Sequence, residues 1–220
     1  MGKSVLNPRS ISNYQFIITM LSRKNWIYLT VFILALFELS PVIAKEASPR
    51  NTVEILLNSI TNLKTGKPLT PEEVKENDIL SYRALALLNI REISRKALGK
   101  YWKKRSLTEQ KVFIDLLSRM FIKEAFPNSG KFFSALKLIY SQTTIKESKA
   151  NVPLTVVHEK EGEINIDFHL QKYRDQWQVV DVDLDEISMR NNMRSQLYKV
   201  ISKNNYQELV RRIKEKLTKY

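Results

Sequence analysis

The strongest constraint on the fold is a change of hydrophobic period near residue 152. Over residues 164–170, apolar and polar residues alternate strictly, which is typical of a strand with one buried face. Two further apolar segments, residues 152–158 and 177–184, are joined to it by short polar links, and residues 143–146 are a candidate fourth, edge strand. This pattern predicts an antiparallel meander of about four strands.

The segment over residues 177–184 carries apolar residues on both faces. Trp177, Val179, Val180 and Val182 cannot all point to one side of a regular strand, because its side chains alternate. The segment is therefore either covered on both sides or bulged near Val179 and Val180.

Helical spacing dominates on both sides of this sheet. Capping boxes at Thr70–Glu73 and Ser106–Glu109 mark two helix starts, and Gly99 is expected to end a short helix. Pro-Asn-Ser-Gly at residues 127–130 is expected to break the chain before a further helix over residues 132–140. The order helices, sheet, helices predicts an α+β fold in which a curved antiparallel sheet packs against a helical layer.

The N-terminus resembles a secretory signal peptide. Arg23 and Lys24 precede an apolar run over residues 26–37, and small residues lead to a cleavage site after Ala44. Residues 1–19 precede Met20 and are either an extension or lie before the true start. The alternative is an uncleaved membrane anchor, although a span needs about 20 apolar residues. Residues 45–220 are then expected to form a single domain.

The charge of the chain favours an anionic partner. The formal net charge is +13, from 36 Lys and Arg against 23 Asp and Glu. Cleavage after Ala44 removes four of the 36 cations and one of the 23 anions, which leaves +10. An exported protein rarely meets DNA, so an acidic lipid surface or an acidic protein is the better candidate. The chain has no cysteine, which excludes disulfide and thiolate chemistry.

No pattern of catalytic or metal-binding residues is complete. Both histidines, His158 and His169, fall on predicted strands without a metal-ligand spacing. The acidic residues Asp181, Asp183 and Asp185 imitate the start of a calcium loop, but the Gly and Glu that such a loop requires later are absent. A general base at Asp167 or Asp181, on a sheet facing helices, is the enzymatic alternative.

Several short motifs follow one another along the chain in a fixed order. A Leu-Gly pair, a Trp and a Glu-Gln pair precede a Phe-bearing helix, and Trp-x-Val-x-Asp-Val, a Ser and an Asn-x-x-Arg-x-Gln helix follow later. They fall on Leu98, Gly99, Trp102, Glu109, Gln110, Phe113, Trp177, Val179, Asp181, Val182, Ser188, Asn191, Arg194 and Gln196. This order and spacing resemble those of the MlaC family, also called toluene-tolerance auxiliary proteins, although Leu197 stands where the family has Phe.

The resemblance implies a periplasmic phospholipid carrier of Gram-negative bacteria with no enzymatic activity. Such a protein shuttles lipid between an MlaA-like outer-membrane lipoprotein complex and an MlaD-like inner-membrane complex of an ABC-transport system, and so maintains the lipid asymmetry of the outer membrane. Phospholipid would be the ligand, with no metal or other cofactor and no nucleic-acid partner, and the protein would be a monomer.

A physical requirement agrees with this expectation. A diacyl lipid that leaves a bilayer exposes roughly 30 methylenes at about 0.8 kcal/mol each, so a carrier must enclose an apolar pocket. The expected lining comprises Leu98, Trp102, Phe113, Leu117, Phe121, Val156, Ile164, Ile166, Phe168, Val180 and Val182. Simple core packing is the alternative for each of them.

The basic corner after Gly99 could contact a headgroup or a partner. Lys103, Lys104 and Arg105 are the candidates, and a merely solvated face is the alternative. Two other classes of protein stay open: a small exported enzyme on a cone-shaped α+β fold, and a basic interaction module without a ligand.

Overall fold

A computed structural model describes residues 48–66, 68–158 and 162–220. The expected signal peptide, its cleavage site and the alternative anchor concern residues that lie outside this description. Among the described residues, no helix has both the length and the apolar content needed to cross a bilayer. Residues Glu46–Tyr220 form one compact unit.

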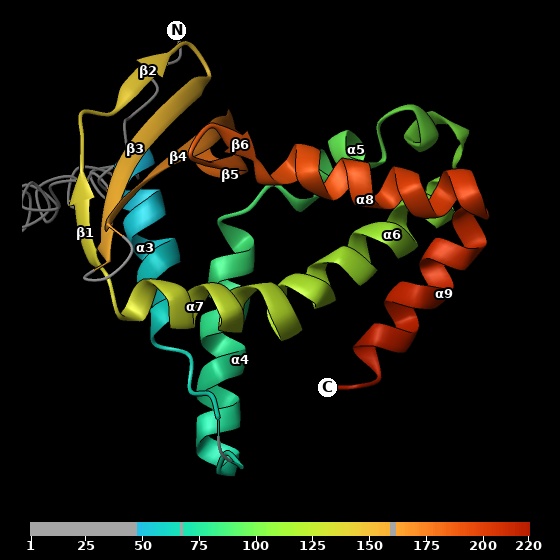
Figure 1. Cartoon of the computed structure of the whole chain (residues 1–220), viewed down its shortest axis with the longest axis horizontal. Helices are drawn as coiled ribbons and strands as arrows, with labels where there is room; N and C mark the ends of the chain where they lie inside the picture. Colours follow the sequence, from blue (N-terminus) through green and yellow to red (C-terminus); the bar gives the residue numbers. More distant parts are fainter. Residues whose placement is uncertain (1–47, 67, 159–161) are drawn as a thin grey trace, which may run out of the picture. The chain divides into compact units, whose positions relative to one another are not determined.

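The change of period in the sequence corresponds to a six-stranded antiparallel sheet (Figure 1). Its centre is the predicted meander of β3 (Lys149–His158), β4 (Gly162–Tyr173) and β5 (Gln176–Leu184). Two short strands, β1 (Lys137–Tyr140) and β2 (Thr144–Lys146), both pair with β3, and β6 (Ile187–Ser188) pairs with β5. The α+β class and the antiparallel sheet are confirmed, and the sheet has two more short strands than expected.

The central strands show the predicted alternation and a bulge, which is one of the two alternatives that the sequence left open. On β4, Ile166, Phe168 and Leu170 are buried while their neighbours are more exposed. The register between β4 and β5 shifts, because His169 pairs with Asp181 whereas Leu170 pairs with Val179. Val180 is therefore the extra residue of a β-bulge, which settles the alternative left open by the sequence.

Pro153 lies where β3 changes its edge partner. The pairing with β1 ends at Leu154, and the pairing with β2 begins at Asn151. The carbonyl of Pro153 accepts a hydrogen bond from Ser141 N–H at 3.0 Å on this edge. Because N–H and C=O of one strand residue point to the same side, the donor that proline lacks would face this gap, where a strand tolerates its absence.

Between residue 48 and the basic corner, the structure describes three helices, each begun by a capping side chain. These are α3 (Pro49–Thr61), α4 (Pro71–Ala86) and α5 (Ile90–Leu98), and Ser48, Thr70 and Asn89 accept hydrogen bonds from their first turns. A 3₁₀ helix, η2 (Gly99–Lys104), follows directly. Gly99 has φ +47°, and a Cβ there would lie 2.3 Å from the Tyr198 hydroxyl, so this close approach requires glycine.

The expected break at residues 127–130 is wrong. Helix α6 (Leu107–Met120), the π-helix η3 (Phe121–Ala125) and α7 (Phe126–Ser134) follow one another without a gap. Pro127 lies in the first turn of α7, where proline is tolerated. A Cβ on Gly130 would lie 2.2 Å from the Ile60 carbonyl oxygen, so this glycine permits close packing of α7 on α3 and does not end a helix.

The expected helix over residues 132–140 is also wrong beyond Ser134. The chain turns there and continues as β1, which joins the sheet through β3. Pairing with a long neighbouring strand outweighed the helical spacing of this short segment. The last two helices, α8 (Met189–Lys203) and α9 (Tyr206–Leu217), were expected, and they pack on α5 and α6 respectively.

Candidate functional site

A cavity of about 710 Å³ lies between the sheet and the helices. Helices α3, α5, α6, α7, α8 and α9, the π-helix η3 and strands β4 and β5 all contribute to its wall. Its apolar lining consists of Leu56, Leu57, Ile60, Leu88, Ile93, Leu117, Met120, Phe121, Ala125, Phe126, Phe132, Phe133, Phe168, Val179, Val180, Val182, Leu184, Met189, Met193, Leu197 and Ile213. Cavities of about 300–1,000 Å³ with such walls are typical ligand sites.

The bulge on β5 shapes the sheet side of this cavity. Val179 pairs with Leu170 and Val182 pairs with Phe168, so both lie on the apolar face although their numbers differ by an odd step. Val180, Asp181 and Leu184 also reach the cavity wall. Without the extra residue, one half of β5 would present its polar side chains to the cavity.

The π-helix keeps one long helix directed at the cavity. From Met120 onward, pairs of lining residues repeat every four positions, at 120/121, 124/125, 128/129 and 132/133, and Phe126 also lines the cavity. In an α-helix a step of four residues drifts about 40° around the axis, so such a stripe would soon turn away. In η3 the Phe126 N–H bonds back five residues to the Phe121 carbonyl, and this wider turn offsets the drift.

The cavity brings together five of the residues expected to bind lipid. Leu117, Phe121, Phe168, Val180 and Val182 line its wall. The other six do not line it and belong to the packed core or its margin: Leu98, Trp102, Phe113, Val156, Ile164 and Ile166. Phe113 and Val156 are fully buried at 0% exposure, which shows close packing where a ligand surface was expected.

Sequence reasoning missed the walls formed by α3, α7 and the C-terminal helices. Leu57, Phe133 and Met193 lie on helical faces that read equally well as core. Leu197 also lines the cavity, and its departure from the family's Phe was the one available signal that this position mattered.

Two charged pairs interrupt the apolar lining. Lys216 on α9 pairs with Glu124 on η3, and both side chains line the cavity. Asp181 on β5 pairs with Arg190 on α8, with 3.0 Å between Asp181 Oδ2 and Arg190 Nη2. Asn128 and Ser129 on α7 add neutral polar groups to the wall.

The Asp181 carboxylate is held by four donors. Its Oδ1 accepts from the backbone N–H groups of Val182 at 2.9 Å and Arg190 at 3.0 Å. Its Oδ2 accepts from the Ser188 hydroxyl at 2.7 Å and from the Arg190 guanidinium. Since Ser188 also caps α8, this network fixes the helix to the strand, and the carboxylate has little remaining capacity to abstract a substrate proton.

The other acidic candidates form separate contacts. Asp167 accepts from the Asn151 side-chain amide at 2.8 Å and does not line the cavity. Asp183 lies 2.9 Å from His169 Nε2, and Asp185 accepts from Asn165 N–H. The side chain of His158 lies outside the described residues. Within the described ranges, no three His, Cys, Asp or Glu side chains are grouped to hold a metal ion.

The basic corner is built from rings that join helices. The Trp102 ring is buried, and Tyr101 meets Tyr198 of α8 edge to face at 4.9 Å between centroids. Lys100 Nζ lies 5.4 Å from both tyrosine rings, which is a cation–π geometry. The Lys100 ammonium is therefore positioned by the two tyrosine rings that it contacts.

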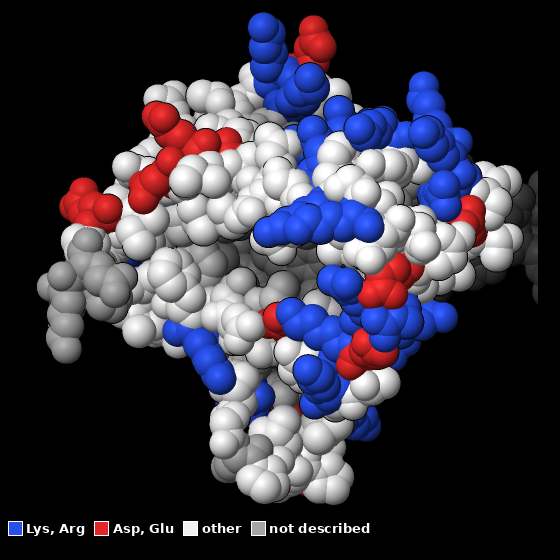
Figure 2. All heavy atoms as spheres, turned by 45° about the vertical axis from the view of Figure 1, so that its right-hand side comes forward, with Lys and Arg blue, Asp and Glu red and all other residues white. Residues whose placement is uncertain are grey.

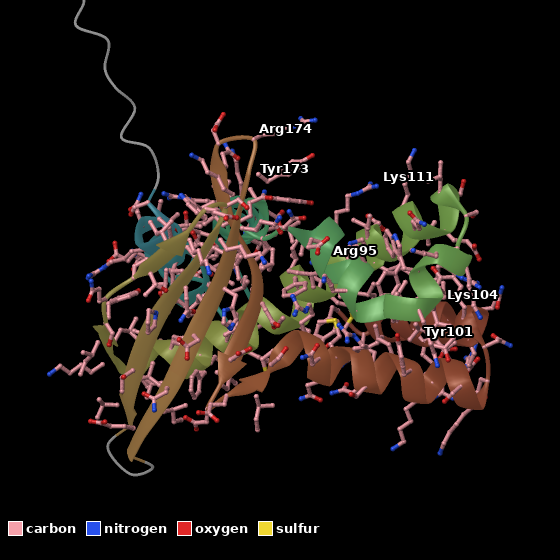
Figure 3. The ribbon with its side chains drawn as sticks, turned by 90° about the horizontal axis from the view of Figure 1, so that it is seen from above. Arg95, Tyr101, Lys104, Lys111, Tyr173 and Arg174 are labelled. Carbon is pink, nitrogen blue, oxygen red and sulfur yellow. The ribbon has the colours of Figure 1, made fainter. Side chains whose placement is uncertain are left out.

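The three basic candidates in this corner differ in their surroundings. Arg105 pairs with Glu109 and lies over the Tyr206 ring at 4.6 Å. Burial, and to a smaller extent Glu109, raises the pKa of Tyr206, so its hydroxyl stays protonated and donates to the Glu109 carbonyl. Lys103 borders a second cavity of about 580 Å³, and Lys104 is exposed; Figure 3 shows Tyr101 and Lys104 at the same end of the molecule.

The second cavity has a basic wall. It is lined by Arg95, Lys96, Gly99, Lys100, Trp102, Lys103, Gln110, Arg194 and Tyr198. Arg95 is paired with Glu92, which lowers the pKa of that carboxyl. Figure 2 shows Lys and Arg side chains gathered along one side of a face that is hollowed near its centre.

An α+β fold with an apolar cavity between its layers defines a protein built to hold an apolar ligand. The chain matches the family model described as MlaC protein over residues 51–215, and it therefore belongs to the MlaC family. The resemblance noted in the sequence is confirmed.

Among solved structures, the chain is similar to one described as the phospholipid-binding protein from Ralstonia solanacearum in complex with a phospholipid. The TM-score is 0.63 at 17% identity, and the match covers 79% of this chain and 97% of that chain. This likeness shows that the two chains share a fold. No curated protein matches the chain.

Proposed function

We propose that this protein binds phospholipid and carries it through the periplasm between an outer-membrane and an inner-membrane complex. The observation that carries the proposal is the apolar cavity of about 710 Å³ in a chain of the MlaC family. The similar Ralstonia solanacearum protein, solved with a phospholipid, supports it.

The walls of the cavity suit acyl tails. Because a lipid in water exposes roughly 30 methylenes at about 0.8 kcal/mol each, desorption is blocked unless a carrier shields them. The tails would contact the cavity walls formed by α3 and α7, together with Leu117, Phe121, Phe168, Val180 and Val182. Leu98, Trp102, Phe113, Val156, Ile164 and Ile166 would act by keeping those walls in place.

Lipid carried by the purified protein is the direct test. Native mass spectrometry and lipid extraction should find phospholipid with the wild-type protein, and much less with Val182→Trp, whose ring would occupy the cavity. Val74→Trp is the matched control, because Val74 is 46% exposed on α4. A protein that carries no lipid after expression and takes none from vesicles would overturn the proposal.

The basic corner is our proposed contact with an anionic headgroup surface or partner. Lys103 borders the basic second cavity, and Lys104 and Arg105 follow it in the chain. Charge reversal of Lys103 and Lys104 should weaken binding to an MlaD-like or MlaA-like complex and reduce its salt dependence. Unchanged binding and salt dependence would remove this corner from the docking surface.

Export and solution state complete the proposal. We expect cleavage after Ala44, a periplasmic monomer, and a role in outer-membrane lipid asymmetry. N-terminal sequencing of the exported protein tests the cleavage site, and light scattering tests the solution state. A carrier of this kind needs no catalytic step, so Asp167→Asn should leave lipid loading unchanged, whereas an enzyme with Asp167 as its base would lose turnover.

A further inference from the structure

The Glu124–Lys216 pair is the polar feature of the cavity that the proposed tail binding does not explain. We infer that this pair recognises the lipid headgroup, and that it selects a headgroup in which a phosphate is followed by a primary ammonium. This inference rests on the proposed function, because it concerns the same cavity. It adds a headgroup preference that tail contacts alone cannot provide.

The position of the pair suits this role. Glu124 comes from the π-helix η3 and Lys216 from the last turn of α9, two elements that meet at the wall of the cavity. The Glu124 side chain is 25% exposed and that of Lys216 is 49% exposed, so the pair lies between the apolar interior and solvent. A diacyl lipid with its tails inside would bring its headgroup to such a boundary.

The pair also has bonding capacity that the protein leaves unused. Glu124 Oε2 is buried and has no hydrogen-bond partner among the described residues. Lys216 contributes one donor to Glu124 Oε1, while an ammonium group has three. A buried acceptor without a partner is unfavourable, so a rotation of the partly exposed Glu124 side chain that brings Oε2 to a donor on the ligand would gain free energy.

The carboxylate of the other charged pair lacks this freedom. Both oxygens of Asp181 are taken up by Val182, Ser188 and Arg190, and the network anchors the start of α8. A ligand that displaced the Arg190 guanidinium would therefore remove one of the contacts that anchor α8, while the other donors would still occupy the carboxylate. The Glu124–Lys216 contact joins two partly exposed side chains, and such ion pairs are weak enough to open when better partners arrive.

The arrangement of charges favours one class of headgroup. Lys216 would donate to the lipid phosphate, and Glu124 would accept from the ammonium two carbons away. A choline headgroup offers no N–H donor to Glu124 Oε2, and a glycerol headgroup offers no cation to balance the carboxylate. Asn128 and Ser129, which line the same wall, can donate to the remaining phosphate oxygens.

The test is a competition among vesicles. The full chain is exported, purified and incubated with vesicles containing equal amounts of phosphatidylethanolamine, phosphatidylglycerol and phosphatidylcholine with identical tails. Bound lipid is then quantified by mass spectrometry. We expect the wild type to prefer the ethanolamine lipid by about tenfold, the factor typical of one charge-assisted hydrogen bond.

Two variants separate the roles of the two charges. Glu124→Gln should bring the preference close to one, and Lys216→Met should lower loading of all three lipids. Glu215→Gln and Lys214→Met are the matched controls, because these neighbours on α9 do not line the cavity, and both should retain the wild-type preference. Circular dichroism of each variant verifies that it has folded.

The possible failures are distinguishable. Equal loading of the three lipids by the wild type would overturn the headgroup inference and leave the proposed carrier function standing. A preference that persists in Glu124→Gln would also overturn it. Absence of any bound lipid would overturn the proposed function itself.

Discussion

The inner face of the sheet is solidly packed on one strand and open on another. On β3, Val152, Leu154 and Val156 are buried to within 1% exposure. On β5, Val180, Val182 and Leu184 are only half-buried and line the cavity. Both strands present apolar residues to the helices, so strand patterning specifies which face is apolar but not whether that face is filled.

The largest difference between the packed and open regions should appear on removal of an aromatic ring. Phe113 is fully buried on α6, so Phe113→Ala should lower the free energy of unfolding by about 3–5 kcal/mol. Phe132 lines the cavity and is 39% exposed, so Phe132→Ala should lower the free energy of unfolding by about 1 kcal/mol or less. Urea unfolding measures both, and equal losses would erase the distinction between packed and open regions.

The next effect concerns the link between the two regions. Asp181→Ala removes the partner of Arg190 and the anchor of α8, so stability should fall by about 3 kcal/mol. Glu124→Gln breaks the more exposed pair and should change stability by less than about 1 kcal/mol. Thermal unfolding of the two variants side by side checks this order. A reversed order would mean that Glu124–Lys216 holds the fold together.

A smaller effect is expected at the contact between two walls of the cavity. Gly130→Ala places a methyl group against the Ile60 carbonyl and should push α7 away from α3, at a cost of about 1–3 kcal/mol. Ser134→Ala, on an exposed position of the same helix, is the control and should be near neutral. If Gly130→Ala is neutral as well, α7 and α3 must separate easily, and the cavity wall is adaptable.

The smallest difference in stability is expected between two valine-to-alanine substitutions on the sheet. Val156→Ala should cost about 2 kcal/mol, because it opens a void in the packed core. Val182→Ala should cost less than about 1 kcal/mol, because the deleted methyl groups already face the cavity. Denaturant midpoints with unchanged slopes give both values. A larger loss at Val182 would show that its side of the sheet is as closely packed as β3.

Local signals in the sequence predicted much of the fold. The alternation on β4 and the two capping boxes each depend on a few neighbouring residues, and all appear in the structure. The bulge at Val180 was one of two alternatives that the apolar residues of β5 left open. The errors arose where a residue type that usually marks a local structure serves a contact between distant elements instead. Gly130 allows close approach to α3, and residues 137–140 pair with β3, so neither could be read from helix propensity alone.

The cavity was harder to predict than the sheet. Five of the expected lining residues reach it, but Phe113 and Val156 have the same apolar character and are packed. What separates the two groups is the distance between facing elements, which depends on the whole arrangement of helices. The π-turn at η3 illustrates the difficulty, because it redirects a long helix although its own five residues include neither glycine nor proline.

The proline in the long third strand has a consequence for how the molecule meets its neighbours. It divides the outer border of the sheet into two stretches of four and three residues, each already covered by a short strand. This border therefore offers no long uninterrupted row of backbone donors and acceptors with which a strand of another molecule could pair. This arrangement disfavours association of molecules through this edge of the sheet, which matters for a chain that lines a cavity with apolar side chains.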